Sequence, residues 1–390
     1  MLNRRRLLMA SGSAATLSLA WPKGALAQGR DPRFVLLVLR GGLDGLALVP
    51  APGDRAYTAA RGALADPLPD DRDGMLELDG FFALHGACRE LHKAYGRGEL
   101  AVVHAVAPPY AGRSHFAGQD VLEAGYPQPS ANSEGWLYRA LTVRPPASPG
   151  EQAVSLSGSI PLVLRGARPV SSWSPDRLPE PAEDTMARVL ALYAEDAELG
   201  PRLDSIMATE DMLGAAAAMN GRGNALRVSV DAAVDFLTHP EGPRVAVLEA
   251  GGWDTHANQQ GQLANRLANL DAMLARLQTG LGSVWAETVV VVATEFGRTV
   301  AMNGTRGTDH GVGGAALVLG GAVNGGQVIA DWPGLEQRAL FEGRDLRPTT
   351  DLRRVFATVL SDHLGLSEAD LVERVFPEVV LPQMSGLLKS

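Results

Sequence analysis

The sequence predicts an α/β fold in which a mostly parallel β-sheet is flanked by helices. Short apolar runs bounded by glycine recur along the chain, which is typical of strands buried in a parallel sheet. Segments with helical spacing of apolar residues separate several of these runs. The 390 residues suffice for one large domain with insertions or for two domains. We expect a single α/β domain over residues 33–377, with a mainly helical insertion near residues 183–240.

Runs of aliphatic residues mark the expected strands. The first run reads Phe-Val-Leu-Leu-Val-Leu, and a later one reads Thr-Val-Val-Val-Val-Ala, both rich in residues that strands favour. Two shorter pieces fall in a stretch rich in proline, serine and glycine. The expected strands cover residues 33–39, 100–106, 153–156, 160–164, 244–249, 288–293 and 315–319.

Helices are expected where apolar residues return every three or four positions. In residues 262–281 these positions are Leu263, Leu267, Leu270, Met273, Leu274 and Leu277. Ser114 has the residue type and place of an N-cap, so a helix is expected from Ser114 to about Glu123. Further helical segments are expected within residues 84–96, 183–239 and 351–364.

Charge and cysteine content exclude some classes of protein. The net charge is −9, and the first 27 residues carry four basic and no acidic side chains, so the rest of the chain has a net charge of −13. Such an acidic protein is a poor candidate for binding nucleic acid. Cys88 is the only cysteine, which excludes an intrachain disulfide. Because it lies in an amphipathic stretch without a motif, we expect a buried core thiol.

The first 27 residues are predicted to form a twin-arginine signal peptide. Three arginines at residues 4–6 precede a mildly apolar run, and residues 25–27 read Ala-Leu-Ala, a small-x-small cleavage pattern. Lys23 fits this route better than general secretion. No stretch of the chain reaches the length of apolar residues that a transmembrane anchor needs. We therefore expect a periplasmic or secreted bacterial protein that uses the twin-arginine export machinery.

Acidic and histidine residues gather in four short turns, three of which directly follow apolar runs. In open α/β sheets, ligands bind beyond the carboxyl ends of the strands. Side chains able to bind a metal ion, placed there four times, predict one converged metal site. The turns are Gly41-Gly42-Leu43-Asp44-Gly45, Gly251-Gly252-Trp253-Asp254-Thr255-His256, Thr294-Glu295-Phe296-Gly297-Arg298 and Gly307-Thr308-Asp309-His310-Gly311.

Five of these residues carry the metal prediction together with Asp44. Asp254 and His256 are two positions apart in an extended segment, so their side chains point to the same side and can share one cation. Glu295 follows the next strand at a similar position. His310 lies in a glycine-dense loop, and Asp309 either orients its ring or binds the ion itself.

Each of these residues also has an ordinary structural interpretation. Asp44 stands where glycines permit close approach of a ligand, yet turn aspartates are common. Asp254 alone could cap a turn beside a surface His256, and Glu295 could pair with Arg298. Because the four turns recur at strand ends, coincidence is the weaker explanation.

Ser114 is the candidate nucleophile. At a helix N-terminus, free backbone N–H groups and the helix dipole favour an anion, and a metal ion could activate the hydroxyl. An ordinary N-cap serine is the alternative. His115 and Arg113 flank Ser114, and Arg113 and Arg298 could each hold a phosphate or sulfate, or form a surface ion pair.

The motif set, in its order, resembles the domain-of-unknown-function family 1501 over about residues 33–377. That family is similar in fold to the alkaline phosphatase and sulfatase superfamily and has no established general activity. The motifs are Leu39-Arg40-Gly41-Gly42-Leu43-Asp44-Gly45, Arg113-Ser114-His115-Phe116, Gly251-Gly252-Trp253-Asp254-Thr255-His256, Thr294-Glu295-Phe296-Gly297-Arg298-Thr299 and Gly307-Thr308-Asp309-His310-Gly311.

The resemblance implies an alkaline-phosphatase-like domain with two metal positions. Asp254, His256 and His310 would form one position suited to zinc or a similar ion. Asp44, Glu295 and Ser114 would form the other, suited to magnesium, manganese or calcium, or empty. The superfamily's histidine there falls on Phe296, and His115 could supply a replacement nitrogen. The sulfatase branch is disfavoured, because neither Ser114 nor Cys88 begins the motif from which its modified nucleophile forms.

We therefore expect an exported metal-dependent hydrolase of phosphoryl or related esters, acting on a small-molecule or polymer-borne anionic ester. Loss of a histidine at Phe296 keeps an alternative open, a non-catalytic protein that binds a ligand or partner on a degenerate phosphatase-like scaffold. An NAD-dependent enzyme is disfavoured, because the Gly41–Gly45 turn does not match G-x-G-x-x-G. Substrate, metal identity and oligomeric state stay open.

Overall fold

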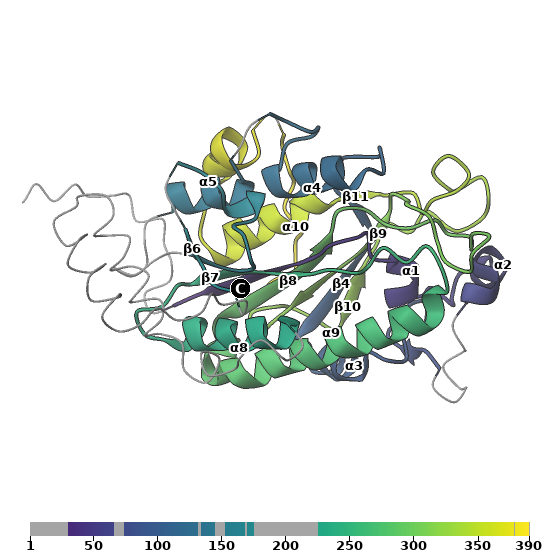
Figure 1. The fold of residues 1–390 in the computed structure, drawn as a ribbon, viewed down its shortest axis with the longest axis horizontal. Coiled ribbons are helices and arrows are strands. Elements are labelled where there is room, and N and C mark those ends of the chain that lie inside the picture. The colour runs from purple at the N-terminus through teal and green to yellow at the C-terminus, as the bar shows by residue number, and fades with distance from the viewer. Residues whose placement is uncertain are drawn as a thin grey trace, which may run out of the picture.

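A nine-stranded mixed β-sheet forms the centre of the molecule (Figure 1). The structure is a computed structural model, which describes residues 30–65, 74–131, 134–144, 153–167, 170–174, 225–377 and 379–389. Its strands are β1 (Arg33–Leu39), β4 (Leu100–Ala107), β5 (Ala153–Leu156), β6 (Ser171–Ser172), β7 (Val245–Ala250), β8 (Thr288–Thr294), β9 (Gly314–Leu319), β10 (Gln327–Ile329) and β11 (Thr350–Asp351). The hairpin of β2 (Leu76–Glu77) and β3 (Ala83–Leu84) is a separate antiparallel sheet.

The strand order is β10-β4-β9-β8-β1-β7-β5-β6, with β11 also paired to β4. β9 runs antiparallel to β4 and β8, and the other pairs of this sheet are parallel. The predicted mostly parallel α/β sheet is therefore confirmed. Because β4 and β8 both oppose β9, they run in the same direction as β1 and β7. The carboxyl ends of these four strands consequently meet at one edge of the sheet.

Helices cover both faces of this sheet. Figure 1 shows α3, α8 and α9 on one side and α4, α5 and α10 on the other. Along β1, Val35, Leu37 and Leu39 pack into one core cluster, while Phe34, Leu36 and Val38 pack into the other. The helices are α1 (Gly45–Leu48), α2 (Tyr57–Arg61), α3 (Arg89–Gly96), α4 (His115–Ala124), α5 (Trp136–Val143), α8 (Ala225–Thr238), α9 (Gln259–Leu281), α10 (Leu352–Thr358) and α11 (Glu368–Asp370).

The long helix α9 matches the apolar periodicity of the sequence. The helix expected over residues 262–281 is confirmed, and it begins three residues earlier, at Gln259. The leucines of the predicted stripe are buried against the sheet, whereas Met273 is partly exposed. Each buried leucine contributes about 1.5–3 kcal/mol relative to an exposed one. The side chain of Cys88 is also fully buried, as expected.

Two of the predicted segments differ from the structure. The helix expected over residues 84–96 begins at Arg89, because the carboxylate of Asp271 on α9 accepts the backbone N–H groups of Glu90 and Leu91 and thereby fixes the first turn. The strand expected over residues 160–164 is wrong. Pro161 lacks the N–H that a sheet ladder requires, and the chain forms a 3-10 turn at Leu162–Leu164.

Some predictions fall on residues that the structure does not describe. The signal peptide of residues 1–27 lies outside the described residues, and so does most of the helical insertion near residues 183–240, of which α8 is described. Within the described ranges, no helix combines the length and apolar character needed to cross a bilayer.

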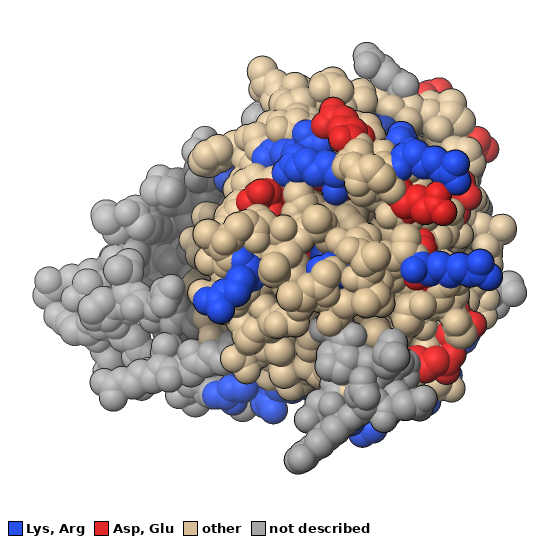
Figure 2. Space-filling model, turned by 90° about the vertical axis from the view of Figure 1, so that its right-hand side faces the viewer, with Lys and Arg blue, Asp and Glu red and all other residues tan. Residues whose placement is uncertain are grey.

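The edge with the converging carboxyl ends faces the viewer in Figure 2. Basic and acidic side chains alternate there around a broad uncharged surface. This is the edge at which the sequence predicts the functional site.

Candidate metal centre

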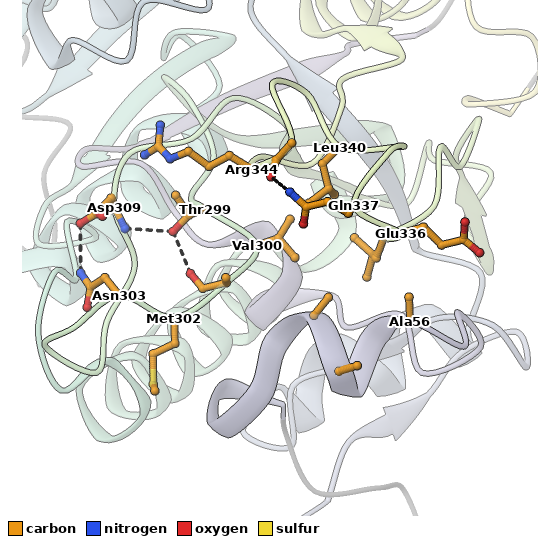
Figure 3. A pocket seen from close by; sticks show the side chains of 15 residues that line it. Ala56, Thr299, Val300, Met302, Asn303, Asp309, Glu336, Gln337, Leu340 and Arg344 are labelled. Carbon is orange, nitrogen blue, oxygen red and sulfur yellow. Dashed lines mark hydrogen bonds between the residues drawn. The ribbon is translucent and has the colours of Figure 1, made fainter.

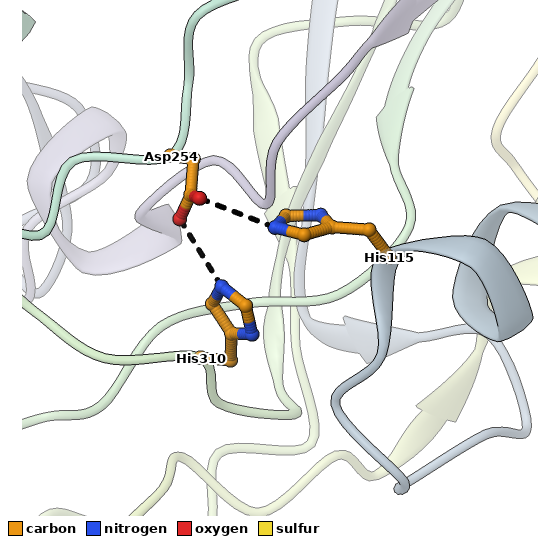
Figure 4. A group of neighbouring side chains, drawn as sticks. All are labelled: His115, Asp254 and His310. Carbon is orange, nitrogen blue, oxygen red and sulfur yellow. Dashed lines mark hydrogen bonds and ion pairs between the residues drawn. The ribbon is translucent and has the colours of Figure 1, made fainter.

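Three side chains from different strand ends meet at this edge. His115 is the first residue of α4, which follows β4; Asp254 lies in the loop after β7, and His310 lies in the loop before β9. Their potential ligand atoms all lie within 4.8 Å of one another (Figure 4). The Nε2 atoms of His115 and His310 approach opposite oxygens of Asp254, at 3.3 and 3.2 Å.

The other ring nitrogen of each histidine is held by an acceptor. His115 Nδ1 lies 2.9 Å from Glu295 Oε1, and His310 Nδ1 lies 2.9 Å from the backbone oxygen of Arg113. Since a carboxylate and a carbonyl can only accept, each Nδ1 must carry the proton. In the tautomer with a proton on Nδ1, the remaining lone pair is on Nε2, the atom directed at Asp254.

The charge states around Asp254 call for a cation. Burial would raise the pKa of Asp254, but the hydrogen bond and charge of Arg298, together with the nearby His256 and His310, outweigh it and hold this pKa below its ordinary value. Burial lowers the pKa of His310, which favours the neutral ring. An ionised carboxylate and the lone pair of a neutral imidazole are both acceptors, so the contact between Asp254 and His310 is favourable when a cation lies between them.

His256 adds a further nitrogen to this group. Its Nε2 is 2.9 Å from Asp254 Oδ1 and 3.1 Å from His310 Nε2. Its Nδ1 is 3.4 Å from Asp309 Oδ1. A hydrogen bond from Asn303, and then one from His256, lowers the pKa of Asp309. Asp309 thus stands behind His256 in the same way that Glu295 stands behind His115, which is the usual support of metal-binding histidines.

Glu295 lies behind His115 and is fully buried. Its Oε1 accepts from the backbone N–H of Gly41 at 2.9 Å and from Gln119 at 3.2 Å, in addition to His115. Burial would raise the pKa of Glu295, but these hydrogen bonds, that of His115 first, lower it. The sequence predicts Glu295 as a ligand, and the structure gives it the place of a positioning residue for His115.

Arg298 positions Asp254. Its guanidinium is buried and donates to Asp254 Oδ1 at 2.5 Å, to Thr308 Oγ1 at 3.0 Å and to the Thr308 backbone oxygen. The donors of Arg298 are thus largely engaged within the protein. Arg113, the other arginine predicted to hold an anion, pairs with Asp345 and Glu342.

Asp44 is not brought into the cluster. Its Oδ1 accepts from Ala47 N and caps α1, while its Oδ2 accepts from Arg61 at 2.8 Å and from Gln259 at 2.6 Å. Only 2% of its side chain is exposed. Both oxygens therefore have protein partners, and the structure gives Asp44 the contacts of a cap and a buried ion pair.

Phe296 forms the wall beneath the histidines. Its ring centroid lies 4.9 Å from those of both His115 and His310. The turn after β1 packs on its other side, where a Cβ at Gly42 would come within 2.4 Å of the ring. Gly42 also has a φ of +71°, so glycine is required at this position for two reasons. Phe296 thus occupies the space beside the two imidazoles.

Ser114 stands at the N-cap of α4, beside the cluster. Its side chain is exposed and makes no capping hydrogen bond to the helix. The preceding Arg113 has a left-handed φ of 56°, which is costly for a non-glycine residue, and its carbonyl receives the Nδ1 proton of His310. The predicted N-cap is confirmed by position, and the hydroxyl remains available to a ligand.

Two contributors to the site were not predicted. Gln119 is one helical turn after His115 and bonds the same Glu295, a relation that i, i+4 spacing could have indicated. Arg344 donates to the backbone oxygen of His310 at 2.7 Å, and its side chain is 40% exposed. It lies in a loop without a motif, so no signal in the sequence points to it.

Comparison with known proteins gives one family and several distant structures. The model of a family described as "Protein of unknown function (DUF1501)" matches residues 103–376, which confirms the resemblance drawn from the motifs. No curated protein matches the chain. Three similar solved structures were compared: Ps i-CgsB in complex with k-i-k-neocarrahexaose, the PsFucS1 sulfatase from Pseudoalteromonas sp., and the C-terminal periplasmic domain of EcEptC from Escherichia coli with Zn.

These structures are 11%, 12% and 11% identical to the chain, with TM-scores of 0.42, 0.41 and 0.39. The matches cover 87%, 93% and 87% of this chain and 74%, 74% and 84% of those chains, in the same order. Because the likeness is distant, function has to be inferred from this chain's own side chains.

Proposed function

Because this chain belongs to the DUF1501 family, whose members share no assigned function, we propose an activity from its own site: metal-dependent hydrolysis of phosphoryl or related esters. The observation that carries the proposal is the convergence of the Asp254 carboxylate with the Nε2 atoms of His115 and His310, whose potential ligand atoms all lie within 4.8 Å of one another. Carboxylate oxygens and imidazole nitrogens are the ligands with which proteins bind divalent metal ions.

Zinc or a similar ion fits the donors best. Two or three imidazole nitrogens with one carboxylate oxygen are typical ligands of catalytic zinc, whereas magnesium and calcium prefer oxygen alone. His115, Asp254 and His310 would hold the ion, and His256 is the candidate fourth ligand. A bound cation would supply positive charge that lowers the pKa of a nearby hydroxyl and stabilises a developing anion.

Ser114 is the proposed nucleophile. Its exposed hydroxyl precedes His115 by one residue and is not used as a cap. The hydroxyl oxygen would bond to phosphorus as the bond to the leaving alcohol breaks, and the alcohol oxygen would take up a proton. Water would then cleave the phosphoserine, releasing phosphate and restoring Ser114. The unpaired N–H groups of the first turn of α4 face an anion favourably.

Arg344 is the proposed anion-binding arginine. Arg298 is buried against Asp254 and Arg113 lies 2.7 Å from Asp345, whereas the guanidinium of Arg344 is 40% exposed beside His310 and reaches Asp345 only at 3.7 Å. A guanidinium binds two oxygens of a phosphate at once, which fixes the orientation of the ester. Arg298 would act through Asp254 and is a positioning residue.

A metal analysis combined with a turnover assay tests this function. Protein stripped with a chelator and reloaded with zinc should hydrolyse aryl phosphate monoesters or diesters. Ser114→Ala should reduce turnover to the rate of the blank, while the exposed control Ser283→Ala should not. Zinc-independent turnover, or full turnover by Ser114→Ala, would contradict the proposal.

The alternative is a ligand-binding protein without turnover. Asp44 and Glu295, which a second metal position would need, are both held by protein donors, and Phe296 fills the space beside the histidines. Zinc and phosphate binding without hydrolysis of any ester would favour this alternative over the enzyme.

We also propose export by the twin-arginine machinery to the periplasm or beyond. The support is the pattern of residues 1–27, three arginines followed by a mildly apolar run and Ala-Leu-Ala. Replacement of Arg4, Arg5 and Arg6 by lysine should leave the precursor in the cytoplasm, as fractionation of the expressing bacterium would reveal.

A further inference from the structure

A groove of about 490 Å³ opens beside the metal centre (Figure 3). One wall is α2 with the residue before it, which contribute Ala56, Ala59 and Ala60. Thr299–Asn303 form a second wall, and residues 335–344 form the third. The volume lies within the range of sites that hold small organic molecules.

The groove reaches the metal centre through two residues. Asp309 lines the groove, and its Oδ1 is the atom that faces His256 Nδ1 at 3.4 Å. Arg344 also lines the groove and donates to the His310 backbone oxygen at 2.7 Å. Figure 3 shows the guanidinium of Arg344 extending to the side on which Asp309 lies. A molecule in the groove would therefore have one end at the centre.

The lining favours an uncharged, flat and largely apolar group. Alanine side chains form one wall, and the exposed Ala301 and Met302 add apolar surface above the buried Val300, Leu335 and Leu340. Several polar side chains of the lining have protein partners: Asn303 donates to Asp309 and to the His256 backbone oxygen, Thr299 donates to Ala301, and Glu336 pairs with Arg338. Gln337 donates to the Gly343 backbone oxygen. A sugar with many hydroxyls would find few partners here, whereas an aromatic ring loses little on leaving water.

We propose that this groove binds the leaving group of the ester, an uncharged aromatic alcohol, while Arg344 and the metal centre hold the anionic group. The inference rests on the proposed hydrolase function, which it extends to a substrate class. Met302, at the open side, supplies a polarisable sulfur that suits contact with an aromatic ring.

Filling the groove tests the proposal. Ala59 is an exposed helical residue of the groove, and Ala272 is an exposed helical residue of α9 that is not part of its lining, so Ala59→Trp and Ala272→Trp form a matched pair. Zinc-loaded protein is assayed with naphthyl phosphate, methyl phosphate and a sugar phosphate. Ala59→Trp should lower kcat/KM for naphthyl phosphate at least tenfold and leave methyl phosphate unchanged. Ala272→Trp should change neither value.

Binding of 2-naphthol separates the groove from the chemistry. Isothermal titration of chelator-treated protein should detect naphthol binding in the wild type and in Ala272→Trp, with at least tenfold weaker affinity in Ala59→Trp. Ala301→Trp, on the opposite wall, should have the same effect and guards against local misfolding at Ala59. Naphthol binding without any ester turnover would contradict the hydrolase function and would support the groove as a binding site only.

Other outcomes overturn the groove itself. Both groove variants could keep zinc-dependent turnover and the wild-type preference for naphthyl over methyl phosphate. That result would refute the binding role of the groove and support the hydrolase function. If the wild type prefers the sugar phosphate and both tryptophan variants lose this preference, the groove binds a sugar and not an aromatic alcohol.

Discussion

Two Gly-Gly-x-Asp turns, at Asp44 and Asp254, follow neighbouring strands and have different surroundings. Each aspartate accepts a hydrogen bond from a fully buried arginine, Arg61 or Arg298. Asp44 is 2% exposed, and its oxygens also accept hydrogen bonds from Ala47 and Gln259. Asp254 is 38% exposed and faces imidazole rings. The same local sequence thus provides a structural cap in one turn and a candidate metal ligand in the other. The role of each aspartate is decided by the groups that other segments of the chain place around its carboxylate.

The largest expected effect is on the stability of the structural turn. Asp44→Asn removes the charge opposite Arg61, and breaking a buried ion pair by changing one member costs about 3–5 kcal/mol. Zinc affinity should be unchanged, since Asp44 does not touch the histidines. Urea unfolding of the metal-free protein, followed by zinc titration, measures both. A stability loss under about 1 kcal/mol together with lost zinc binding would reverse the roles of the two turns.

The second effect concerns Asp254, where we expect the substitution to change zinc affinity more than stability. Asp254→Asn keeps an oxygen for Arg298 but removes the negative charge between His115 and His310. Zinc affinity should fall by more than about 100-fold, beyond the loss typical of an outer partner. Stability of the metal-free protein should fall by less than in Asp44→Asn, because Asp254 is 38% exposed although its partner Arg298 is buried. Competition with a chromophoric chelator gives the affinity, and an unchanged value would refute the ligand role.

A smaller effect should follow from Glu295, which reaches the centre through His115. In Glu295→Gln the amide can no longer act as a charged acceptor for His115 Nδ1. Zinc affinity should fall about 10–100-fold, the range for outer partners of metal ligands. Glu287→Gln, at a surface pair with Arg30, is the control and should bind zinc like the wild type. Equal affinities in both variants would show that Glu295 only supports packing.

The last effect concerns histidines away from the site, which change the pH dependence of stability and leave the metal centre untouched. Burial lowers the pKa of His104 and of His363 to about 4, from 6.5. As the pH falls from about 6.5 to about 4, these two histidines bind protons in the unfolded chain but not in the folded protein. The free energy of unfolding therefore falls. Each histidine contributes up to about 1.4 kcal/mol per pH unit in this window.

Unfolding of metal-free protein in urea at several pH values between 7 and 4.5 measures this slope. His104→Gln should reduce this slope by up to about 1.4 kcal/mol per pH unit relative to the wild type. A free energy of unfolding that stays constant over this range would mean that the two rings are protonated in the folded protein.

The strands could be predicted because burial on both faces of the sheet leaves a pattern in the sequence itself. In β1 and β8 every residue is buried, so an unbroken aliphatic run gives the strand nearly to its ends. The direction of β9 could not be predicted, since its residues are equally apolar in either orientation. The start of α3 was missed for a different reason, because the carboxylate that fixes it, Asp271, comes from another helix.

The sequence predicted the location of the site, but not the role of each of its residues. Strand ends and glycine turns indicated where Asp254, His256 and His310 gather, and the structure brings these three together with His115. The role of Asp44 could not be inferred, because its partners Arg61 and Gln259 lie 17 and 215 residues away along the chain. The second position implied by the family resemblance likewise depended on contacts, those of Glu295 with Gly41 and His115, that no local pattern encodes.

We propose that His115, Asp254 and His310 hold one divalent cation. Crystals of the protein grown with zinc, and measured on both sides of the zinc absorption edge, test it most directly. One anomalous peak is expected, at bonding distance from His115 Nε2, a carboxylate oxygen of Asp254 and His310 Nε2. A peak only at Asp44, or no peak at this edge of the sheet under saturating zinc, would contradict it.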